Sequence, residues 1–172
     1  MGKYFGTDGF RGEANVGLTV MHAFEIGRYL GWYYGKEHKA RVVIGKDTRQ
    51  SGDMLEAALT AGLCSVGADV ESLGVLPTPA VAYLVGKYNA DAGIVISASH
   101  NPMEFNGIKI FKGEGYKVPD EVENEIERHI FDGCKDIKLC EGAGIGRVRR
   151  LDCAVDDYVD ALQAHIDADL SG

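Results

Sequence analysis

The sequence predicts an α/β fold, a three-layer α/β/α sandwich around a mixed, mainly parallel four-stranded sheet with one antiparallel edge strand. Two observations support this fold class. Short apolar runs alternate with segments of helical periodicity along most of the chain, which is the signature of consecutive β-α-β units. Two of these runs, 42–44 and 94–96, are continuously apolar, as expected of strands that helices cover on both faces.

The predicted elements follow in order from these patterns. Ser51 is a candidate N-cap for the second helix, and Thr78 is one for the third, where Pro79 would take the first helical position. Acidic residues in the first turn favour the fourth helix, because they complement its dipole. The predicted strands are 41–45, 68–76, 92–97 and 107–112, and the predicted helices are 19–37, 51–67, 78–88, 119–131 and 156–166.

The fourth strand differs from the first three in how it is connected. Only about nine residues separate Ser97 from Gly107, which is too few for a helical crossover, so this strand is expected to run antiparallel at an edge. A further strand is possible at 146–152. Residues 1–154 are expected to form one domain, and 155–172 a linker helix that leads toward an absent second domain.

Composition narrows the class of protein. The 172 residues are 45% hydrophobic and 26% charged, with a net charge of −8. Proteins that bind nucleic acids or membrane surfaces lean basic, so neither partner is expected. The sequence shows no signal-peptide pattern and no apolar run of membrane-spanning length, which predicts a cytoplasmic protein. The cysteines lack metal-site spacing and are expected to be free thiols: Cys64, Cys134, Cys140 and Cys153.

The candidate chemistry lies where the predicted parallel strands end. Ligands of open α/β sheets bind at the carboxyl ends of the strands, and the loops there carry hydroxyl, amide and cationic side chains. The returning fourth strand and the glycine-rich segment 5–12 add two further cations. Such a cluster beside flexible backbone suits a phosphorylated ligand. The residues concerned are Lys46, Arg49, Ser97, Ser99, His100, Asn101, Lys109 and Arg11.

Residue pattern alone leaves two alternatives open. The run Ser99-His100-Asn101-Pro102 is equally typical of a simple turn, because Asn-Pro favours turn initiation. Lys109 could be an exposed edge-strand lysine that protects the sheet from aggregation. No G-x-S-x-G motif is present, which disfavours acyl transfer at a serine.

Taken together, three segments resemble a known family. "KYFGTDGFRG", "GKDTRQSG" and "GIVISASHNPMEFNGIKIF" are similar to the first domain of the α-D-phosphohexomutases, and the opening segment resembles most the bacterial phosphoglucosamine mutases. The resemblance covers nearly the whole chain, with the segments in the expected order. It implies an α/β/α domain that carries a phosphoserine.

The resemblance also implies a role for individual residues. Ser99 matches the serine that carries the transferable phosphoryl group, and Lys109 matches the lysine that assists proton transfer beside it. The segment Asn106-Gly107 is expected to turn the chain so that Lys109 returns beside Ser99. His100 and Arg11 are the other implied catalytic residues, and the implied contacts to substrate or phosphate are Asn101, Thr7 and Arg49.

The implied reaction interconverts glucosamine 6-phosphate and glucosamine 1-phosphate through a hexosamine 1,6-bisphosphate, with hexose 1,6-bisphosphate as activator. The resemblance implies Mg²⁺, bound by Ser99 only through its phosphate. The Asp-Gly-Asp-Gly-Asp-Arg type motif that would supply the other ligands is absent, since Asp167 and Asp169 lack its glycines and arginine. The expected partners are therefore a phosphorylated hexosamine and the remaining domains of a parent enzyme, without which the domain is expected to be inactive.

Three alternatives remain beside this hypothesis. The phosphomannomutase/phosphoglucomutase branch of the same family differs in sugar specificity, and the loop that selects the sugar lies outside this chain. A non-catalytic α/β binding module would keep the fold without the reaction. A receiver domain is disfavoured, because its third strand would end in an aspartate acceptor, whereas this one ends in Ser97-Ala98-Ser99.

Overall fold

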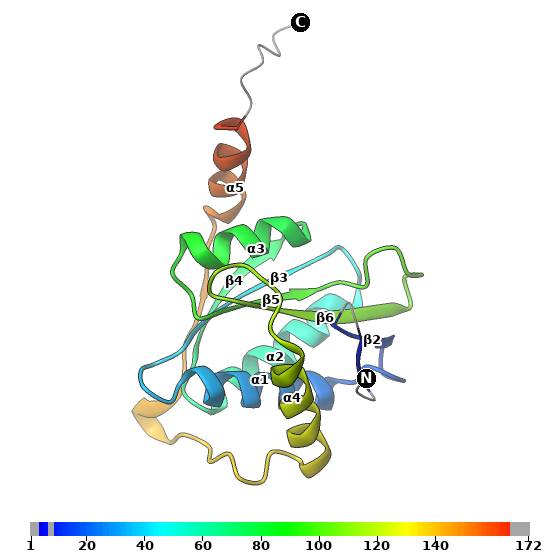
Figure 1. Cartoon of the computed structure of the whole chain (residues 1–172), viewed down its shortest axis with the longest axis vertical. Helices are drawn as coiled ribbons and strands as arrows, with labels where there is room; N and C mark the ends of the chain where they lie inside the picture. Colours follow the sequence, from blue (N-terminus) through cyan, green and yellow to red (C-terminus); the bar gives the residue numbers. More distant parts are fainter. Residues whose placement is uncertain (1–3, 7–8, 166–172) are drawn as a thin grey trace, which may run out of the picture.

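A computed structural model of the chain describes residues 4–6 and 9–165 (Figure 1). The α/β class with a mixed sheet is confirmed. The strands are β1 (Phe5–Gly6), β2 (Gly9–Glu13), β3 (Arg41–Lys46), β4 (Asp69–Val75), β5 (Ala92–Ile96), β6 (Phe105–Lys112) and β7 (Val148–Arg150). The helices are α1 (Val20–Tyr34), α2 (Ser51–Ser65), α3 (Thr78–Lys87), α4 (Asp120–Asp132) and α5 (Ala154–Gln163), with a short 3₁₀ turn η1 at Gly142–Gly144.

The sheet has seven strands in the order β1-β2-β6-β5-β3-β4-β7, so the prediction of four strands is wrong. Strands β1 and β2 were missed, because the glycine-rich segment that forms them resembles a turn. Strand β6 is antiparallel to β5, as predicted, but it also pairs with β2 and is therefore not an edge strand. The interpretation of Lys109 as an edge-strand lysine is wrong for the same reason.

Two start positions and one turn also differ from the predictions. Helices α2 and α3 begin at Ser51 and Thr78, and their N-cap residues are Gln50 and Pro77. Residues 106 and 107 lie inside β6, so the turn between β5 and β6 is made by the preceding residues. Cross-strand pairing outweighed the local turn preference of Asn-Gly, because β2 and β5 both offer hydrogen-bond partners to β6.

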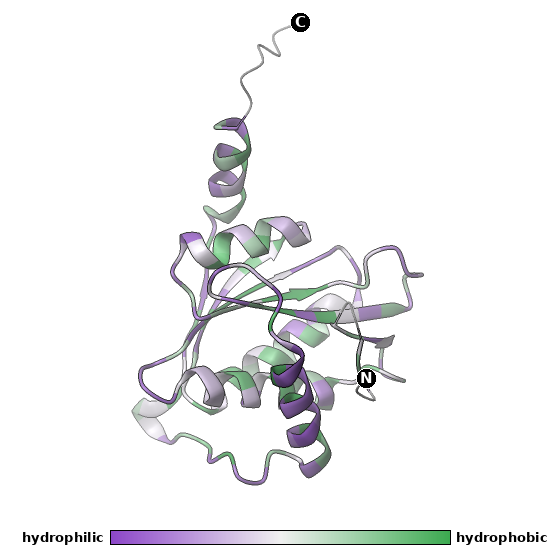
Figure 2. Cartoon of the chain, viewed as in Figure 1, coloured by the Kyte–Doolittle hydropathy of each residue, from purple (hydrophilic) through white to green (hydrophobic). Residues whose placement is uncertain are grey.

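Helices cover both faces of the sheet. Helices α1 and α2 pack on one face and α3 on the other, while α4 lies beside α1 (Figure 1). Ile94 and Ile96 point toward the α1–α2 layer and Val95 toward α3, which is why this strand is continuously apolar. Figure 2 shows the apolar residues concentrated between these layers, whereas α4 is largely hydrophilic on its outside.

Two glycines let α1 and α2 pack very closely. A Cβ atom added at Gly62 of α2 would lie 2.1 Å from the carbonyl oxygen of Phe24, and one added at Gly27 of α1 would lie 2.4 Å from that of Leu59. Real Cβ atoms do not approach backbone so closely. The contact between these helices therefore depends on the absence of a side chain at both positions.

We expect Gly62→Ala to destabilise the domain by about 3 kcal/mol, because the added methyl group forces the two helices apart. Urea denaturation would measure the loss. Gly86→Ala in α3 is the matched control, since its Cβ would lie 3.6 Å from the nearest heavy atom, and alanine should favour the helix by up to about 1 kcal/mol. Equal stability of the Gly62→Ala variant and the wild type would show that the helices do not meet this closely.

The C-terminal helix α5 is attached to α3 at its first turn. Asp157 accepts hydrogen bonds from the Lys87 ammonium at 2.7 Å and from the Tyr88 hydroxyl at 2.5 Å. The Lys87 hydrogen bond, followed by that of Tyr88, lowers the pKa of Asp157 to about 2. Beyond this anchor the helix projects away from the sandwich (Figure 1).

The cysteines are all free, as predicted. Cys134 is buried, and this burial raises the pKa of its thiol to about 12, so the side chain packs as a small apolar group. Among the helices of the described ranges, none has both the length and the apolar composition needed to cross a membrane.

Candidate functional site

Ser99 lies in the β5–β6 loop (residues 97–104), at the carboxyl end of the central strand β5. Its backbone has φ = 58°, in the left-handed region, where a residue with a side chain costs roughly 1–2 kcal/mol. The preceding turn supports this conformation, because the Ser99 amide donates to Ser97 Oγ at 3.0 Å and the Asn101 amide donates to the Ala98 carbonyl at 3.1 Å. Ser99 itself is exposed, so its hydroxyl is open to a ligand.

Arg49 holds this loop from the neighbouring β3–α2 connection. One guanidinium nitrogen, Nη2, donates to the Ser99 carbonyl at 3.2 Å and to the Asn101 carbonyl at 2.7 Å. The other, Nη1, donates to the carboxylate of Asp47. The same carboxylate accepts from the Arg49 amide at 3.0 Å, which makes a local turn of the Asx type. The arginine predicted to contact phosphate is thus engaged with the protein itself.

Arg11 and Lys109 come together on the α3 side of the sheet. In the antiparallel register, Arg11 of β2 lies opposite Gly107 of β6, and Lys109 lies opposite Val95, which faces α3. Residues that are opposite, or two apart on one strand, share a face of the sheet. Arg11 Nη1 also donates to Asn101 Oδ1 at 3.3 Å, which ties the N-terminal hairpin to the Ser99 loop.

Gly107 gives the Arg11 side chain room to cross β6. A Cβ added at Gly107 would lie 3.1 Å from Arg11 Cγ and 2.7 Å from the Ser97 carbonyl oxygen. Lys109 is partly buried, and it forms no salt bridge to any residue in 4–6 or 9–165. Two cationic side chains therefore border the end of the sheet from which the Ser99 loop leaves.

Lys46, a cation that the sequence pattern also placed here, is committed elsewhere. Its ammonium contacts the carboxylates of Asp53, at 2.5 Å, and Glu56 on α2. Burial by itself lowers the pKa of this ammonium, but the hydrogen bonds to the two carboxylates outweigh it and raise the pKa above its ordinary value. Lys46 thus stays charged and neutralised inside the fold.

Two polar residues that sequence reasoning missed support the site. Asp47 orients Arg49, and the Asp-x-Arg spacing of an Asx turn was the signal that could have identified it. Asn106 is fully buried; it donates to Ser51 Oγ of α2 at 2.9 Å and accepts from the Gly107 amide at 2.8 Å. It thereby fixes the start of β6 against α2.

The remaining predicted residues are placed as follows. His100 is exposed, next to Ser99 in the loop. Thr7, Asp167 and Asp169 lie outside the described residues. Across the ranges that are described, no group of three or more His, Cys, Asp and Glu side chains could hold a metal ion.

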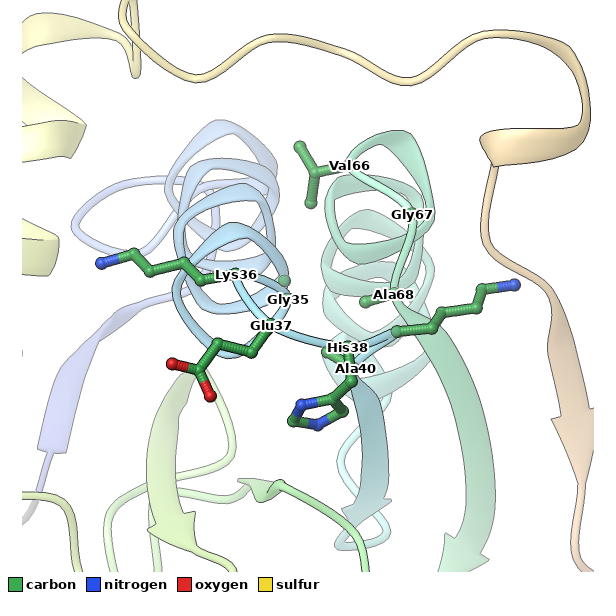
Figure 3. Close-up of a pocket in the computed structure, with 10 residues that line it drawn as sticks. Gly35, Lys36, Glu37, His38, Ala40, Val66, Gly67 and Ala68 are labelled. Atoms are coloured by element: carbon green, nitrogen blue, oxygen red, sulfur yellow. The ribbon is translucent and has the colours of Figure 1, made fainter.

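Two cavities help to locate the site. One of about 580 Å³ adjoins the Ser99 loop on the α2 side, where Met103, Glu104 and Ser51 are among its lining residues. Another of about 350 Å³ lies at the opposite end of the sheet, between the loops that follow α1 and α2 (Figure 3). Its His38 pairs with Asp91 at 2.7 Å. The hydroxyl, amide and guanidinium groups described above lie at the end of the sheet beside the Ser99 loop, not at the end with the second cavity.

Comparisons with known proteins agree with this arrangement. Residues 2–136 match the family model for phosphoglucomutase/phosphomannomutase, α/β/α domain I. A phosphoglucosamine mutase from Clostridioides difficile (strain 630) is 55% identical over 173 residues, which cover 100% of this chain and 39% of that protein. One from Lachnoclostridium phytofermentans is 58% identical over 147 residues, covering 86% of this chain and 33% of that protein.

A solved structure shows the same fold at lower identity. A phosphoglucomutase/phosphomannomutase family protein from Burkholderia thailandensis superposes with a TM-score of 0.76 at 28% identity, over 91% of this chain and 34% of that one. The chain thus spans 39% or less of the length of these relatives. On the match over residues 2–136 and identities above 50% along the whole chain, this chain belongs to the phosphoglucomutase/phosphomannomutase family.

Proposed function

We propose that this chain is the phosphoserine-bearing domain of a phosphoglucosamine mutase, which interconverts glucosamine 6-phosphate and glucosamine 1-phosphate. The observation that carries the proposal is the exposed Ser99 on a backbone-anchored loop, with Arg11 and Lys109 at the same end of the sheet. The names of relatives more than 50% identical support the choice of sugar. Residues 155–172 then lead toward the rest of the parent enzyme.

Phosphoryl transfer requires that these residues position the reacting groups and neutralise developing charge. The bond between Ser99 Oγ and phosphorus breaks as a hydroxyl of the bound hexosamine phosphate bonds to the same phosphorus. The sugar hydroxyl loses its proton and Ser99 Oγ gains one. In this proposal Lys109 relays the proton, and Arg11 neutralises charge that develops on the phosphoryl oxygens. The bisphosphate then turns around and returns its other phosphoryl group to Ser99.

His100 and Asn101 complete the loop. The imidazole of His100 is exposed beside Ser99 and can contact the phosphate or a sugar hydroxyl. Asn101 engages Arg11 through its side-chain oxygen, which leaves its amide N–H groups to donate to a phosphate. Thr7 is a further phosphate contact in this proposal. Hexose 1,6-bisphosphate would load Ser99 at the start of the cycle.

A magnesium ion fits the phosphate on Ser99 but not the protein groups of this chain alone. Mg²⁺ requires several oxygen ligands, and the described residues offer no cluster of three suitable side chains. We place the other ligands in the parent enzyme beyond this chain. When bound, the ion would neutralise charge on the phosphoryl oxygens.

The test is turnover by the full-length parent enzyme and by the 172-residue chain, followed with phosphorus NMR. We expect the parent, after priming with glucose 1,6-bisphosphate, to convert glucosamine 6-phosphate with a higher kcat/KM than glucose or mannose 6-phosphate. The chain alone should be inactive. Preference for glucose or mannose phosphate would favour the other branch of the family. Tight sugar-phosphate binding without turnover by the parent would instead indicate a binding module.

A further inference from the structure

The guanidinium of Arg49 has its hydrogen-bonding groups directed mainly at other parts of the protein. The guanidinium of Arg49 bonds to three oxygens of the protein, on Asp47, Ser99 and Asn101. Only 12% of its side chain is exposed. A side chain so occupied is suited to holding the protein in one shape, rather than to exchanging partners with a substrate.

The backbone conformation that Arg49 holds, at Ser99, is an energetically unfavourable one. Ser99 lies at φ = 58°, which the surrounding structure must stabilise against relaxation to an ordinary conformation. Arg49 accomplishes this by binding the carbonyl groups on both sides of His100. These contacts fix two carbonyl groups of the loop that carries Ser99.

Asp47 links this clamp to the sheet. Its backbone amide donates to the Ile96 carbonyl at 3.0 Å, so it continues the pairing of β3 with β5. Its carboxylate binds both the Arg49 amide and the Arg49 guanidinium. The rigid end of the sheet is thereby connected to the loop through a pair of opposite charges.

We propose that Asp47 and Arg49 act together as a positioning pair that holds Ser99 in its left-handed conformation for phosphoryl transfer, and that Arg49 does not bind the substrate phosphate. This inference rests on the proposed function, in which Ser99 carries the phosphoryl group. It replaces the expectation of Arg49 as a phosphate contact. The two roles differ in kinetics, because a positioning residue changes kcat and a phosphate ligand of the ground state also changes KM.

The test is Arg49→Lys in the full-length parent enzyme. Lysine keeps the charge but cannot reach three oxygens with a planar fork. We expect kcat to fall by about 100-fold, the loss typical of a misplaced reacting group, with KM for the sugar phosphate within about twofold of wild type. Asp47→Asn keeps an oxygen for the Arg49 amide but loses the charge, and kcat should fall by about 10-fold.

Arg28→Lys is the matched control. Arg28 is also 12% exposed, and it likewise binds one carboxylate, of Glu25, and the backbone carbonyls of residues 133, 134 and 137. Arg28 lies on α1, and the segment that it binds follows α4 and is not part of the Ser99 site. In urea denaturation, Arg28→Lys should lose about as much stability as Arg49→Lys does. Its kcat should stay at the wild-type value.

Amide hydrogen exchange of the 172-residue chain gives a second readout. In Arg49→Lys, exchange should accelerate at residues 99–101 and stay unchanged in β5. A raised KM with unchanged kcat would overturn the proposal in favour of direct phosphate binding. Unchanged kcat and unchanged exchange would also overturn it. Failure of the proposed function would look different, since the wild-type parent would then not turn over glucosamine 6-phosphate in preference to other sugar phosphates.

Discussion

Ser99→Ala should abolish phosphoryl loading and lower kcat of the full-length parent enzyme by about 10⁴-fold or more, as expected when the group that carries the reaction is removed. The physical reason is that no other hydroxyl occupies its place in the loop. Ser97 Oγ is already the acceptor for the Ser99 amide. Since Ser99 is exposed, removing its hydroxyl leaves no buried group unpaired, and the fold should remain intact.

Intact mass after incubation with glucose 1,6-bisphosphate measures this loading directly. We expect about one phosphoryl group per chain in the wild type, when the remaining domains are supplied, and none in Ser99→Ala. Thr48→Ala is the control, because Thr48 is an exposed hydroxyl in the neighbouring β3–α2 connection; it should load normally. Full loading of the Ser99→Ala variant would refute the assignment of the phosphoserine.

Lys109→Met should lower kcat of the parent enzyme by about 10³-fold, within the range found when a group that transfers protons is removed. Methionine keeps an unbranched side chain of similar length, so the packing around β6 should survive. Lys109 makes no salt bridge within residues 4–6 and 9–165, and its loss should therefore change the free energy of unfolding by less than about 1 kcal/mol.

Lys112→Met on the same strand separates catalysis from strand stability. Lys112 pairs with Glu114 at 3.4 Å, near the other end of β6, and this exposed pair contributes little. We expect wild-type turnover from this control. If Lys109→Met unfolded the domain while Lys112→Met did not, the lysine would have a structural role in the sheet, and the catalytic assignment would have to be withdrawn.

The order of the central elements could be predicted from sequence because it depends on local patterns. The apolar runs of β3 and β5 and the helical periodicity of α2 and α3 are visible along the chain, and the short connection to β6 required it to be antiparallel. The Ser99 loop, Lys109 and Arg11 were identified from motifs that resemble those of a family. The Ser99 loop directly follows the carboxyl end of β5, where ligands of such sheets bind.

Other features depend on contacts between distant segments, which no local pattern specifies. Strand β2 became a strand because β6 supplied a partner some hundred residues away, and this pairing also made β6 an interior strand. Asn106 lies in β6 rather than in a turn, since its backbone pairs with Gly12 of β2. Ser51 and the Gly107 amide satisfy its side chain.

The sequence by itself determined the α/β class, the family and the serine that we assign to phosphoryl transfer. Only the tertiary structure decided which of the candidate cations are paired with other groups within the fold. Lys46 is neutralised by Asp53 and Glu56, and Arg49 is held by Asp47 and two carbonyl groups. The sequence shows the same lysine or arginine whether the side chain is paired within the fold or left to bind a ligand. Its role follows from the partners that folding brings within hydrogen-bond distance, because a paired and partly buried cation cannot leave those partners without losing the hydrogen bonds that offset its desolvation.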